Sequence, residues 1–244
     1  LRNTIASAEK LTFAGGLVYS LRPQRKAGKP LRARRVTMRA DAPMKRQLLL
    51  SRLLDNRERG SVGNFLRDKA RPDAELSVVS AYFTIHAYQV LKPTLETVGR
   101  LRFLFGEPSF IVSLDPARAH APGARIAEDA LELSEQLRQS RVARDCADWL
   151  AEKAEVRSVR RPDFVHGKLY HIRQGDYERA VLGSSNFTVR GLGLGHRPNI
   201  ELNLEVTDSR DQEDLRNWFD ALWNDPDLVE DVKAQVLAHL ERLY

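Results

Sequence analysis

The sequence predicts an α/β fold, and three neighbouring segments favour it. Residues 75–84, ELSVVSAYFT, are rich in Val, Tyr and Phe and predict a buried strand. Residues 87–99 predict a helix that ends at Gly99, and residues 100–108, RLRFLFGEP, predict the next strand. Strand, helix and strand at this spacing are typical of a βαβ unit, in which a helix packs against a sheet.

The segment before this unit predicts two short helices. Leucines recur at helical spacing over residues 47–54, and a second apolar pattern begins after Gly60. The positions that carry the two patterns are Leu49, Leu50, Leu53 and Leu54, followed by Val62 and Leu66.

The second half of the sequence continues the alternation of helices and strands. Residues 124–153 predict a long helix, residues 155–161 a strand, and the segment after residue 208 two helices, the second of which runs to Tyr244. Because the sequence ends inside this helical pattern, we expect the chain to be a module of a longer protein. The first of the two helices is expected to pack on the core rather than to stack on bases. Its apolar residues are Leu215, Trp218, Phe219, Leu222 and Trp223.

Composition excludes several classes of protein. With 244 residues and 42% hydrophobic content, the chain is long enough to form a buried core. It has no run of about eighteen apolar residues and no signal-peptide pattern, so we expect no membrane partner and a cytoplasmic location. Cys146 is the single cysteine, which excludes an internal disulfide and a multi-cysteine zinc site, and we interpret it as a core residue.

Positive charge is concentrated near the beginning of the chain. The net charge is +6, but residues 22–46 alone hold ten Lys and Arg against one acidic residue, Asp41. We therefore predict two parts, a basic N-terminal arm or leader at residues 1–46 and a globular domain at residues 47–244. A basic arm can bind phosphate backbones without sequence preference. The alternative is an unstructured leader, because Pro23, Gly28 and Pro30 interrupt regular structure.

The segment FVHGKLYHIRQGDYERAVLGSSNF, residues 164–187, predicts a β-hairpin. If residues 164–172 are extended, His166 and Lys168 point to one face, whereas His171 points to the other and is interpreted as structural. Gln174-Gly175-Asp176 predicts the turn, after which the chain returns antiparallel. We therefore expect the Gly-Ser-Ser-Asn tetrapeptide at residues 183–186 to lie near His166.

Residues 199–206, NIELNLEV, alternate between polar and apolar side chains. One interpretation is a half-exposed strand whose polar face is solvated, and the alternation by itself favours it. The functional interpretation places Asn199 and Glu201 beside His166, where a carboxylate would orient the imidazole through its second nitrogen.

Together these residues resemble the motif of the phospholipase D superfamily, His-x-Lys followed by Asp and then by Gly-Ser-x-Asn. His166-Gly167-Lys168 and Gly183-Ser184-Ser185-Asn186 match it, and Asn199-x-Glu201 is similar to the family's trailing element. Six residues separate Asp176 from Gly183, as in the family, but seven separate it from Lys168, where the family has four. The resemblance spans about residues 55–224 and implies a mixed sheet flanked by helices on both faces.

The resemblance also implies a mechanism that needs no metal and no cofactor. A neutral histidine attacks phosphorus to form a phosphohistidine, and a second histidine protonates the leaving oxygen. Lys168, Asn186 and Ser184 would donate to the non-bridging oxygens, and with His166 and Glu201 they are the expected catalytic residues. Because the chain has one such motif, the resemblance implies a homodimer that brings two copies of His166 together.

Further residues are expected near the substrate. The Gly-rich segment RGLGLGHRPN, residues 190–199, predicts a flexible loop at the mouth of the site. Its Arg190, Arg197 and Asn199 are expected to contact the substrate. Asp176 is a candidate for the family's aspartate, although turn formation explains it equally well.

The leading hypothesis is a metal-independent nuclease domain that cleaves DNA, as part of a helicase-containing or restriction-type defence system. The basic arm favours nucleic acid over lipid. The segments VSAYFT and LRFLFGEPS are similar to phospholipase-D-like domains that precede helicase-type ATPase regions in bacterial proteins. One alternative is hydrolysis of phospholipids or other phosphodiesters by the same residues, and another is a non-catalytic DNA-binding or dimerisation module.

Overall fold

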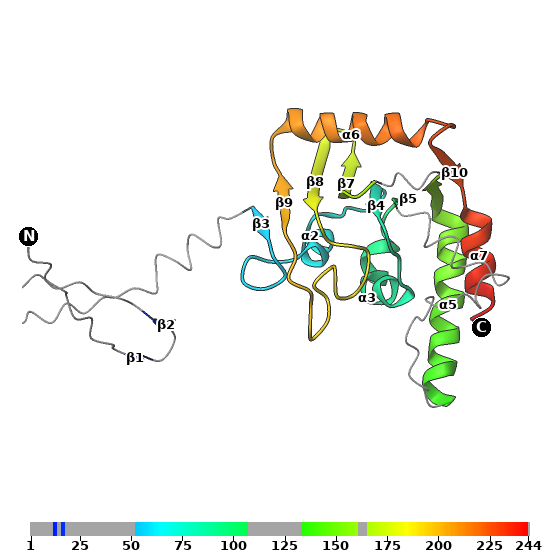
Figure 1. Ribbon diagram of the computed structural model, residues 1–244. Helices are drawn as coiled ribbons and strands as arrows, with labels where there is room; N and C mark the ends of the chain where they lie inside the picture. The colour runs from blue at the N-terminus through cyan, green and yellow to red at the C-terminus, as the bar shows by residue number, and fades with distance from the viewer. Residues whose placement is uncertain (1–11, 14–15, 18–51, 107–132, 161–164, 244) are drawn as a thin grey trace, which may run out of the picture. The chain divides into compact units, whose positions relative to one another are not determined.

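The computed structural model describes residues 12–13, 16–17, 52–106, 133–160 and 165–243. The chain divides into two units, Leu1–Ala40 and Asp41–Tyr244. In the first unit, β1 (Thr12–Phe13) and β2 (Gly16–Leu17) form an antiparallel pair (Figure 1). Nearly all of the predicted basic arm, residues 1–46, lies outside the described residues, so its boundary and its role stay predictions.

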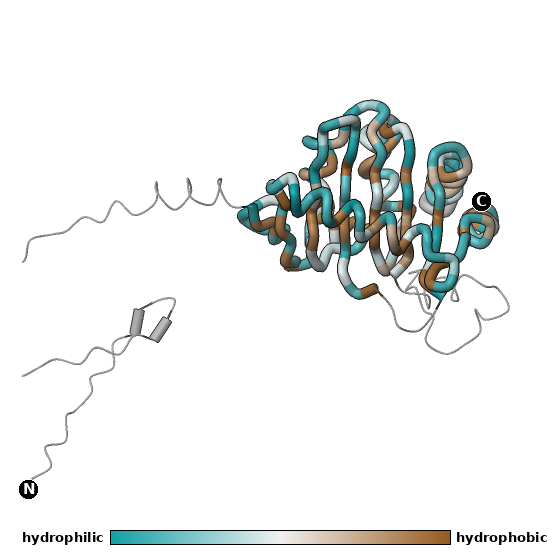
Figure 2. Tube along the Cα trace, turned by 90° about the horizontal axis from the view of Figure 1, so that it is seen from above, coloured by the Kyte–Doolittle hydropathy of each residue, from teal (hydrophilic) through white to brown (hydrophobic). Residues whose placement is uncertain are grey.

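An eight-stranded mixed sheet forms the centre of the second unit (Figure 1). Its strands in chain order are β3 (Leu53–Leu54), β4 (Glu75–Ser80), β5 (Arg100–Phe105), β6 (Ala154–Val159), β7 (Lys168–Gln174), β8 (Tyr177–Gly183), β9 (Asn203–Val206) and β10 (Val229–Asp231). The order across the sheet is β10-β6-β5-β4-β7-β8-β9-β3. The pairs β4–β5 and β5–β6 are parallel, and the other pairs are antiparallel. Figure 2 shows hydrophobic residues interspersed with hydrophilic ones along the chain of this unit.

Helices cover both faces of this sheet. They are α2 (Val62–Lys69), α3 (Ile85–Leu95), α5 (Leu133–Lys153), α6 (Ser209–Trp223) and α7 (Lys233–Glu241). Side chains of α2, α3, α5 and α7 belong to one buried cluster, and those of α6 belong to a second. Neighbouring residues of a strand divide between the clusters, because successive side chains point to opposite faces: Val78 packs in the first and Val79 in the second. The predicted α/β fold, a mixed sheet flanked by helices on both faces, is therefore confirmed.

The predicted βαβ unit is formed by β4, α3 and β5. α3 begins at an N-cap, Thr84, whose hydroxyl accepts a hydrogen bond of 3.3 Å from the Ala87 N–H. The chain then turns at Gly99, where a Cβ atom would lie 2.9 Å from the Asp73 carbonyl oxygen. Glycine is thus required there, because any side chain would clash with the backbone that leads into β4.

One predicted element differs in the structure, one strand has no predicted counterpart, and one predicted helix is described only in part. Leu53 and Leu54 form β3, which pairs with Leu204 and Asn203 of β9, rather than the end of a helix, while residues 47–51 lie outside the described residues. Pairing between segments far apart in the sequence here overrides a local helical pattern. The three-residue strand β10 is too short to give a sequence signal. Of the long predicted helix, residues 124–132 lie outside the described residues.

The two clusters also test the predicted core residues. Cys146 is buried, as predicted, and burial raises the pKa of its thiol. On α6, Phe219 and Trp223 are buried and stacked, whereas Trp218 is exposed, so the prediction that all the aromatic residues of this helix are core is wrong at Trp218. In the part of the chain that the structure describes, no helix is long and apolar enough to cross a bilayer.

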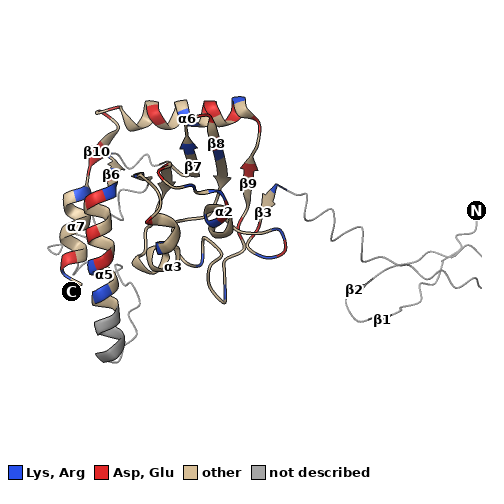
Figure 3. Cartoon of the chain, turned by 180° about the vertical axis from the view of Figure 1, so that it is seen from behind, with Lys and Arg blue, Asp and Glu red and all other residues tan. Residues whose placement is uncertain are grey.

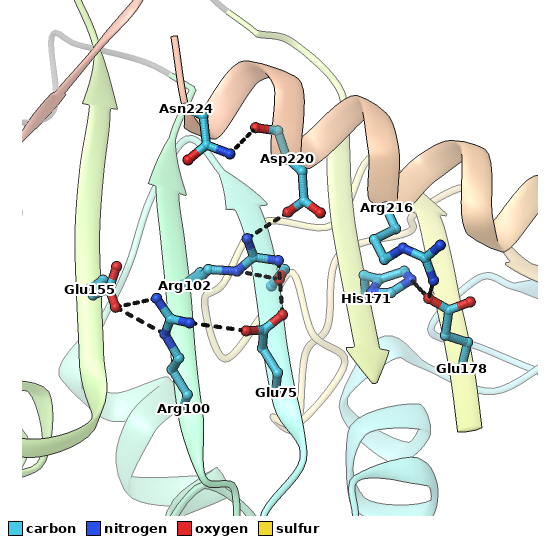
Figure 4. Close-up of polar contacts among 10 residues, drawn as sticks. Glu75, Arg100, Arg102, Glu155, His171, Glu178, Arg216, Asp220 and Asn224 are labelled. Atoms are coloured by element: carbon cyan, nitrogen blue, oxygen red, sulfur yellow. Dashed lines mark hydrogen bonds and ion pairs between the residues drawn. The ribbon is translucent and has the colours of Figure 1, made fainter. Parts of the chain in front are cut away.

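Charged residues lie along α6 and on the strands of the sheet (Figure 3), and ion pairs join the helix to the sheet (Figure 4). The guanidinium of Arg102 on β5 contacts Glu75 at 2.9 Å and Asp220 of α6 at 2.6 Å. Arg216 of α6 pairs with Glu178 of β8. These ion pairs are part of the packing that holds α6 on its face of the sheet.

Candidate active site

The predicted hairpin of β7 and β8 brings the two halves of the motif together. The strands pair from Lys168↔Gly183 to Gln174↔Tyr177, so the start of β7 lies beside the end of β8. At Gly183 a Cβ atom would lie 2.4 Å from the Leu202 carbonyl oxygen. Glycine is needed at this position because the backbone before β9 passes too close for a side chain.

A cavity of about 450 Å³ lies at this end of the hairpin. All five of the expected catalytic residues line it, and they come from three segments of the chain. The complete lining is Ala81, Tyr82, Val165, His166, Lys168, Gly183, Ser184, Asn186 and Glu201. The structure thus gathers the predicted histidine, lysine, hydroxyl, amide and carboxylate around one space.

His166 and Lys168 stand at the entrance to β7. His166 is exposed and lies just before the strand, whereas Lys168 is its first residue and is buried. The Lys168 ammonium donates a hydrogen bond of 2.7 Å to the His166 carbonyl oxygen. This bond ties the cation to the backbone that carries the imidazole, so the two side chains are held beside the same cavity.

Asn186 is oriented by its contact with the loop after β4. Its amide oxygen accepts a hydrogen bond of 3.0 Å from the Ala81 N–H. The following residue, Phe187, is buried and stacks on Phe83 with 5.1 Å between ring centroids. Because the amide oxygen is engaged with a donor, the amide nitrogen of Asn186 is the group available to donate toward a ligand in the cavity.

Glu201 forms a polar chain with Ser184 and Asn199. Its carboxylate accepts hydrogen bonds from the Ser184 hydroxyl and, at 3.3 Å, from the Asn199 side-chain amide. The Ser184 oxygen in turn accepts a bond of 3.0 Å from the Leu202 N–H. The carboxylate therefore shares the cavity lining with His166, and its hydrogen bond holds the Ser184 hydroxyl, whereas Asn199 lies outside the lining.

Asn203 belongs to the framework of the site, and the sequence analysis does not single it out. Its side chain is buried, and its oxygen accepts bonds of 3.1 Å from both the Ser184 and Ser185 N–H groups. Its nitrogen donates to the Leu54 carbonyl and to the Ser185 hydroxyl. The buried side-chain amide of Asn203 thus holds the Gly-Ser-Ser-Asn turn through both its oxygen and its nitrogen.

Tyr170 supports the same turn from below. Its hydroxyl donates a hydrogen bond of 2.9 Å to the Ser185 carbonyl. Burial, together with the negative charge of Glu201, raises the pKa of Tyr170 well above its ordinary value. The phenol therefore stays a neutral donor.

The expectation of a solvated polar face on residues 199–206 is wrong at Asn203. Asn203 is buried, while Ile200, Leu202 and Leu204 are exposed. Of the four polar residues, Asn203 is buried, Asn199 is exposed, and Glu201 and Glu205 are partly exposed. Asn203 turns inward because the Gly-Ser-Ser-Asn turn offers backbone N–H groups that need an acceptor.

The expected substrate-binding arginines lie outside the cavity lining. Arg190 and Arg197 are exposed, and the Arg190 carbonyl accepts a bond of 3.0 Å from the Asn199 N–H. The loop that carries them is anchored to the domain by a hydrogen bond and by a buried side chain. Asn56 donates to the Gly191 carbonyl at 2.8 Å, and Leu192 is fully buried.

Asp176 lies away from the cavity. It occupies the turn between Gln174 and Tyr177, at the end of the hairpin opposite Lys168. Over a seven-residue strand this separation is about 20 Å. The structure therefore brings together His166, Lys168, Ser184, Asn186 and Glu201, but not Asp176.

His171 also lies apart from the cavity. It is buried on the α6 face of β7, with its Nε2 atom 3.5 Å from Glu178. Burial chiefly lowers the pKa of its imidazole. Among the described residues, no group of three or more His, Cys, Asp or Glu side chains could hold a metal ion.

Comparisons with known proteins bear on the domain that contains this site. Residues 111–223 match the model of a family described as cardiolipin synthase, PLD-like domain. The chain is also similar to the crystal structure of phosphatidylserine synthase from Haemophilus influenzae Rd KW20, at 14% identity and a TM-score of 0.41. That similarity covers 75% of this chain and 40% of the other, so the chain spans less than half of that protein's length. No curated protein matches the chain. The family match includes every residue from His166 to Glu201.

Proposed function

We propose that this chain, which carries a phospholipase-D-like domain, is a phosphodiesterase that cleaves DNA through a phosphohistidine on His166, without a metal ion. The observation that carries the proposal is the convergence of His166, Lys168 and Asn186 on one cavity of about 450 Å³. An imidazole beside a cation and an amide donor is suited to attack on a phosphodiester.

In the first step, a ring nitrogen of His166 forms a bond to phosphorus and the phosphorus–oxygen bond to the leaving group breaks. The leaving oxygen takes a proton from a second histidine. In the second step, a water molecule loses a proton to that second histidine and its oxygen bonds to phosphorus, while the phosphorus–nitrogen bond breaks. Two easier displacements thus replace one difficult displacement, and both histidines return to their starting states.

Charge develops on the non-bridging oxygens during each displacement. The Lys168 ammonium and the Asn186 amide nitrogen are the donors proposed to stabilise it. Both are positioned in advance, by the bond to the His166 carbonyl and by the bond from the Ala81 N–H. Such preorganised donors act in the transition state without a further cost of reorientation.

The second histidine is proposed to be His166 of another copy of this chain. The cavity has one histidine in its lining. A homodimer with a twofold axis would bring two equivalent histidines to one phosphate, and the two imidazoles would then titrate as a coupled pair.

DNA is the proposed substrate because of the excess of basic residues in the sequence and the two exposed arginines of the loop at residues 190–199. The charge of residues 22–46 and the exposed Arg190 and Arg197 support binding to a phosphate backbone. The similarity of the upstream segments supports a helicase-containing or restriction-type system as the context. The matched family's description names a cardiolipin synthase, which supports a phospholipid as the substrate in a second candidate function, phosphodiester hydrolysis in the same cavity.

The test is cleavage of labelled single-stranded and double-stranded DNA in the presence of EDTA, by the wild type and by His166→Ala. We expect cleavage that persists in the chelator and falls by at least about 1,000-fold in the variant. His86→Ala, which removes an exposed histidine outside the cavity lining, is the matched control and should cleave normally. A phosphorylated wild-type intermediate, absent from His166→Ala, should be trapped by acid quenching.

Two results would contradict the proposal. Equal DNA binding without cleavage in the wild type and in His166→Ala would identify a non-catalytic module. Release of a headgroup from phospholipid vesicles, with no cleavage of either DNA, would favour the second candidate.

A further inference from the structure

One large aromatic side chain lines the cavity and has no part in the proposed chemistry. Tyr82 lies in the loop after β4, and it is 46% exposed. In the described lining it is the single Phe, Tyr or Trp, because the other residues there are charged, polar or small. An aromatic ring left this exposed gains little from burial within the fold, so a contact outside the chain is the use to consider.

The backbone of Tyr82 is fixed against the site. The buried Ser80 hydroxyl donates a hydrogen bond of 2.8 Å to the Tyr82 carbonyl oxygen and accepts one of 2.9 Å from the Phe187 N–H. Ala81, between the two, holds the amide oxygen of Asn186. The aromatic ring and the amide donor proposed to contact the phosphate are therefore carried by two segments that are bonded to each other.

The next residue, Phe83, explains why the ring of Tyr82 is directed outward. Phe83 forms a β-bridge with Phe187 and packs against the first buried cluster. Its ring stacks on Phe187 at 5.1 Å and meets the edge of Phe103 at 5.5 Å between centroids. Because neighbouring side chains of an extended segment point to opposite sides, Tyr82 is left on the side of the cavity.

The cavity accommodates more of a substrate than its phosphate group. Its volume of about 450 Å³ lies within the range of roughly 300–1,000 Å³ that is usual for sites that hold drug-sized ligands. Lys168 and Asn186 are suited to the charged oxygens, whereas an aromatic ring is suited to a flat, apolar group attached to the phosphate. In DNA that group is the base, and every base has a face on which an aromatic ring can stack.

We propose that Tyr82 is a substrate-binding residue that stacks on an unpaired base next to the scissile phosphate, so that the cavity selects single-stranded DNA. This inference rests on the proposed function, because it takes a DNA phosphodiester as the ligand of the cavity. A base inside a duplex is covered on both faces by its neighbours and must be extruded before a protein ring can reach it. Stacking on Tyr82 therefore favours single strands without favouring a particular sequence.

The first test measures binding, on the full chain with His166→Ala so that the DNA stays intact. The probes are a labelled single strand and an abasic strand of the same length, which keeps the phosphates and sugars but lacks the bases. Tyr82→Leu should weaken binding of the ordinary strand by about 5-fold to 100-fold, because an apolar side chain remains but the stacking is lost. It should leave binding of the abasic strand unchanged, which isolates the contact between ring and base.

Two further variants control this measurement. Tyr82→Phe keeps the ring and should retain the preference for the ordinary strand over the abasic one. Trp218→Leu removes an aromatic residue of α6 that is 44% exposed and lies outside the cavity lining, and it should bind both strands as the parent protein does. Thermal unfolding should confirm that all the variants are folded.

The second test measures cleavage in the His166 protein. The wild type should cleave the single strand with a higher kcat/KM than the duplex of the same sequence. Tyr82→Leu should lose most of this preference, mainly through a higher KM for the single strand, because the ring contacts the base equally in the ground state and in the transition state.

The outcomes separate this inference from the proposed function. DNA cleavage by a Tyr82→Leu protein that binds both strands as before would overturn the inference and leave the function intact. Base-dependent binding that Tyr82→Leu removes, with no cleavage in the wild type, would support the stacking and contradict the function. Equal losses with the ordinary and the abasic strand would overturn the inference, as would a loss of phospholipid hydrolysis in Tyr82→Leu without any effect on DNA.

Discussion

Two regions near opposite ends of the β7–β8 hairpin contain polar residues of similar kinds in different surroundings. Beneath α6, Arg102, Glu75 and Asp220 fill the space between helix and sheet and satisfy one another (Figure 4). At the other end, His166, Lys168 and Asn186 line an open cavity. The difference indicates that paired charges between packed layers support the fold. Polar groups that are held by hydrogen bonds to the protein but also face a cavity are available for chemistry.

The largest expected effect is a loss of activity when the cation at the cavity is removed. Lys168→Met keeps the length of the side chain but removes the cation beside His166, so we expect a loss of about 100-fold to 1,000-fold in kcat/KM. The free energy of unfolding should change little, because the variant no longer buries an ammonium. Steady-state kinetics and denaturant titration on the same samples measure both. A large loss of stability would place Lys168 with the structural charges.

The next largest effect is a loss of stability when the buried cation beneath α6 is removed. Arg102→Met leaves Glu75 and Asp220 without their shared cation beneath α6, and we expect the free energy of unfolding to fall by about 3 kcal/mol. Arg100→Met is the matched control, because Arg100 also pairs with Glu75 but is about half exposed. It should cost less than about 1 kcal/mol. Equal losses in urea denaturation would contradict the assignment of Arg102 as the buried centre of the network.

Asn203 connects the fold to the site, so its removal should affect both measurements. Asn203→Ala leaves two backbone N–H groups without their acceptor, and we expect a loss of about 2 kcal/mol together with reduced kcat. Asn203→Asp keeps an acceptor oxygen and should recover part of kcat. Asn199→Ala, which removes one exposed contact with Glu201, is the control and should change stability by less than about 0.5 kcal/mol.

The smallest expected effect is a pH dependence of stability that comes from His171, on the α6 face of the sheet. Burial, with the charges of Arg216, Arg102 and Arg173, lowers the pKa of His171 below its ordinary value of 6.5, although Glu178 opposes the shift. The unfolded chain therefore binds this proton more readily, and the stability present above pH 6.5 falls as the pH decreases toward the folded pKa.

Each pH unit in that window costs at most about 1.4 kcal/mol. Urea denaturation at pH 7.5 and pH 5.5 measures the loss, which His171→Gln should reduce. The same loss in the wild type and in His171→Gln would assign it to other groups.

Much of the architecture follows from local patterns. The strand-helix-strand spacing of residues 75–105 and the turn at Gly175 predict the observed elements, because helix periodicity, strand composition and turn chemistry act over a few residues. The helix predicted at Leu53 and Leu54 fails for the opposite reason. Its leucines pair with β9, about 150 residues later, and no local pattern records that partner.

The site shows the same division between features set by local patterns and features set by distant segments. The sequence by itself determined that Gly183 to Asn186 return to the segment of His166 and Lys168, since this follows from the turn and from antiparallel pairing. Only the tertiary structure decided which face of residues 199–206 turns inward. Alternation specifies two faces without ranking them, and burial of Asn203 with exposure of Leu202 and Leu204 depends on what packs on each side.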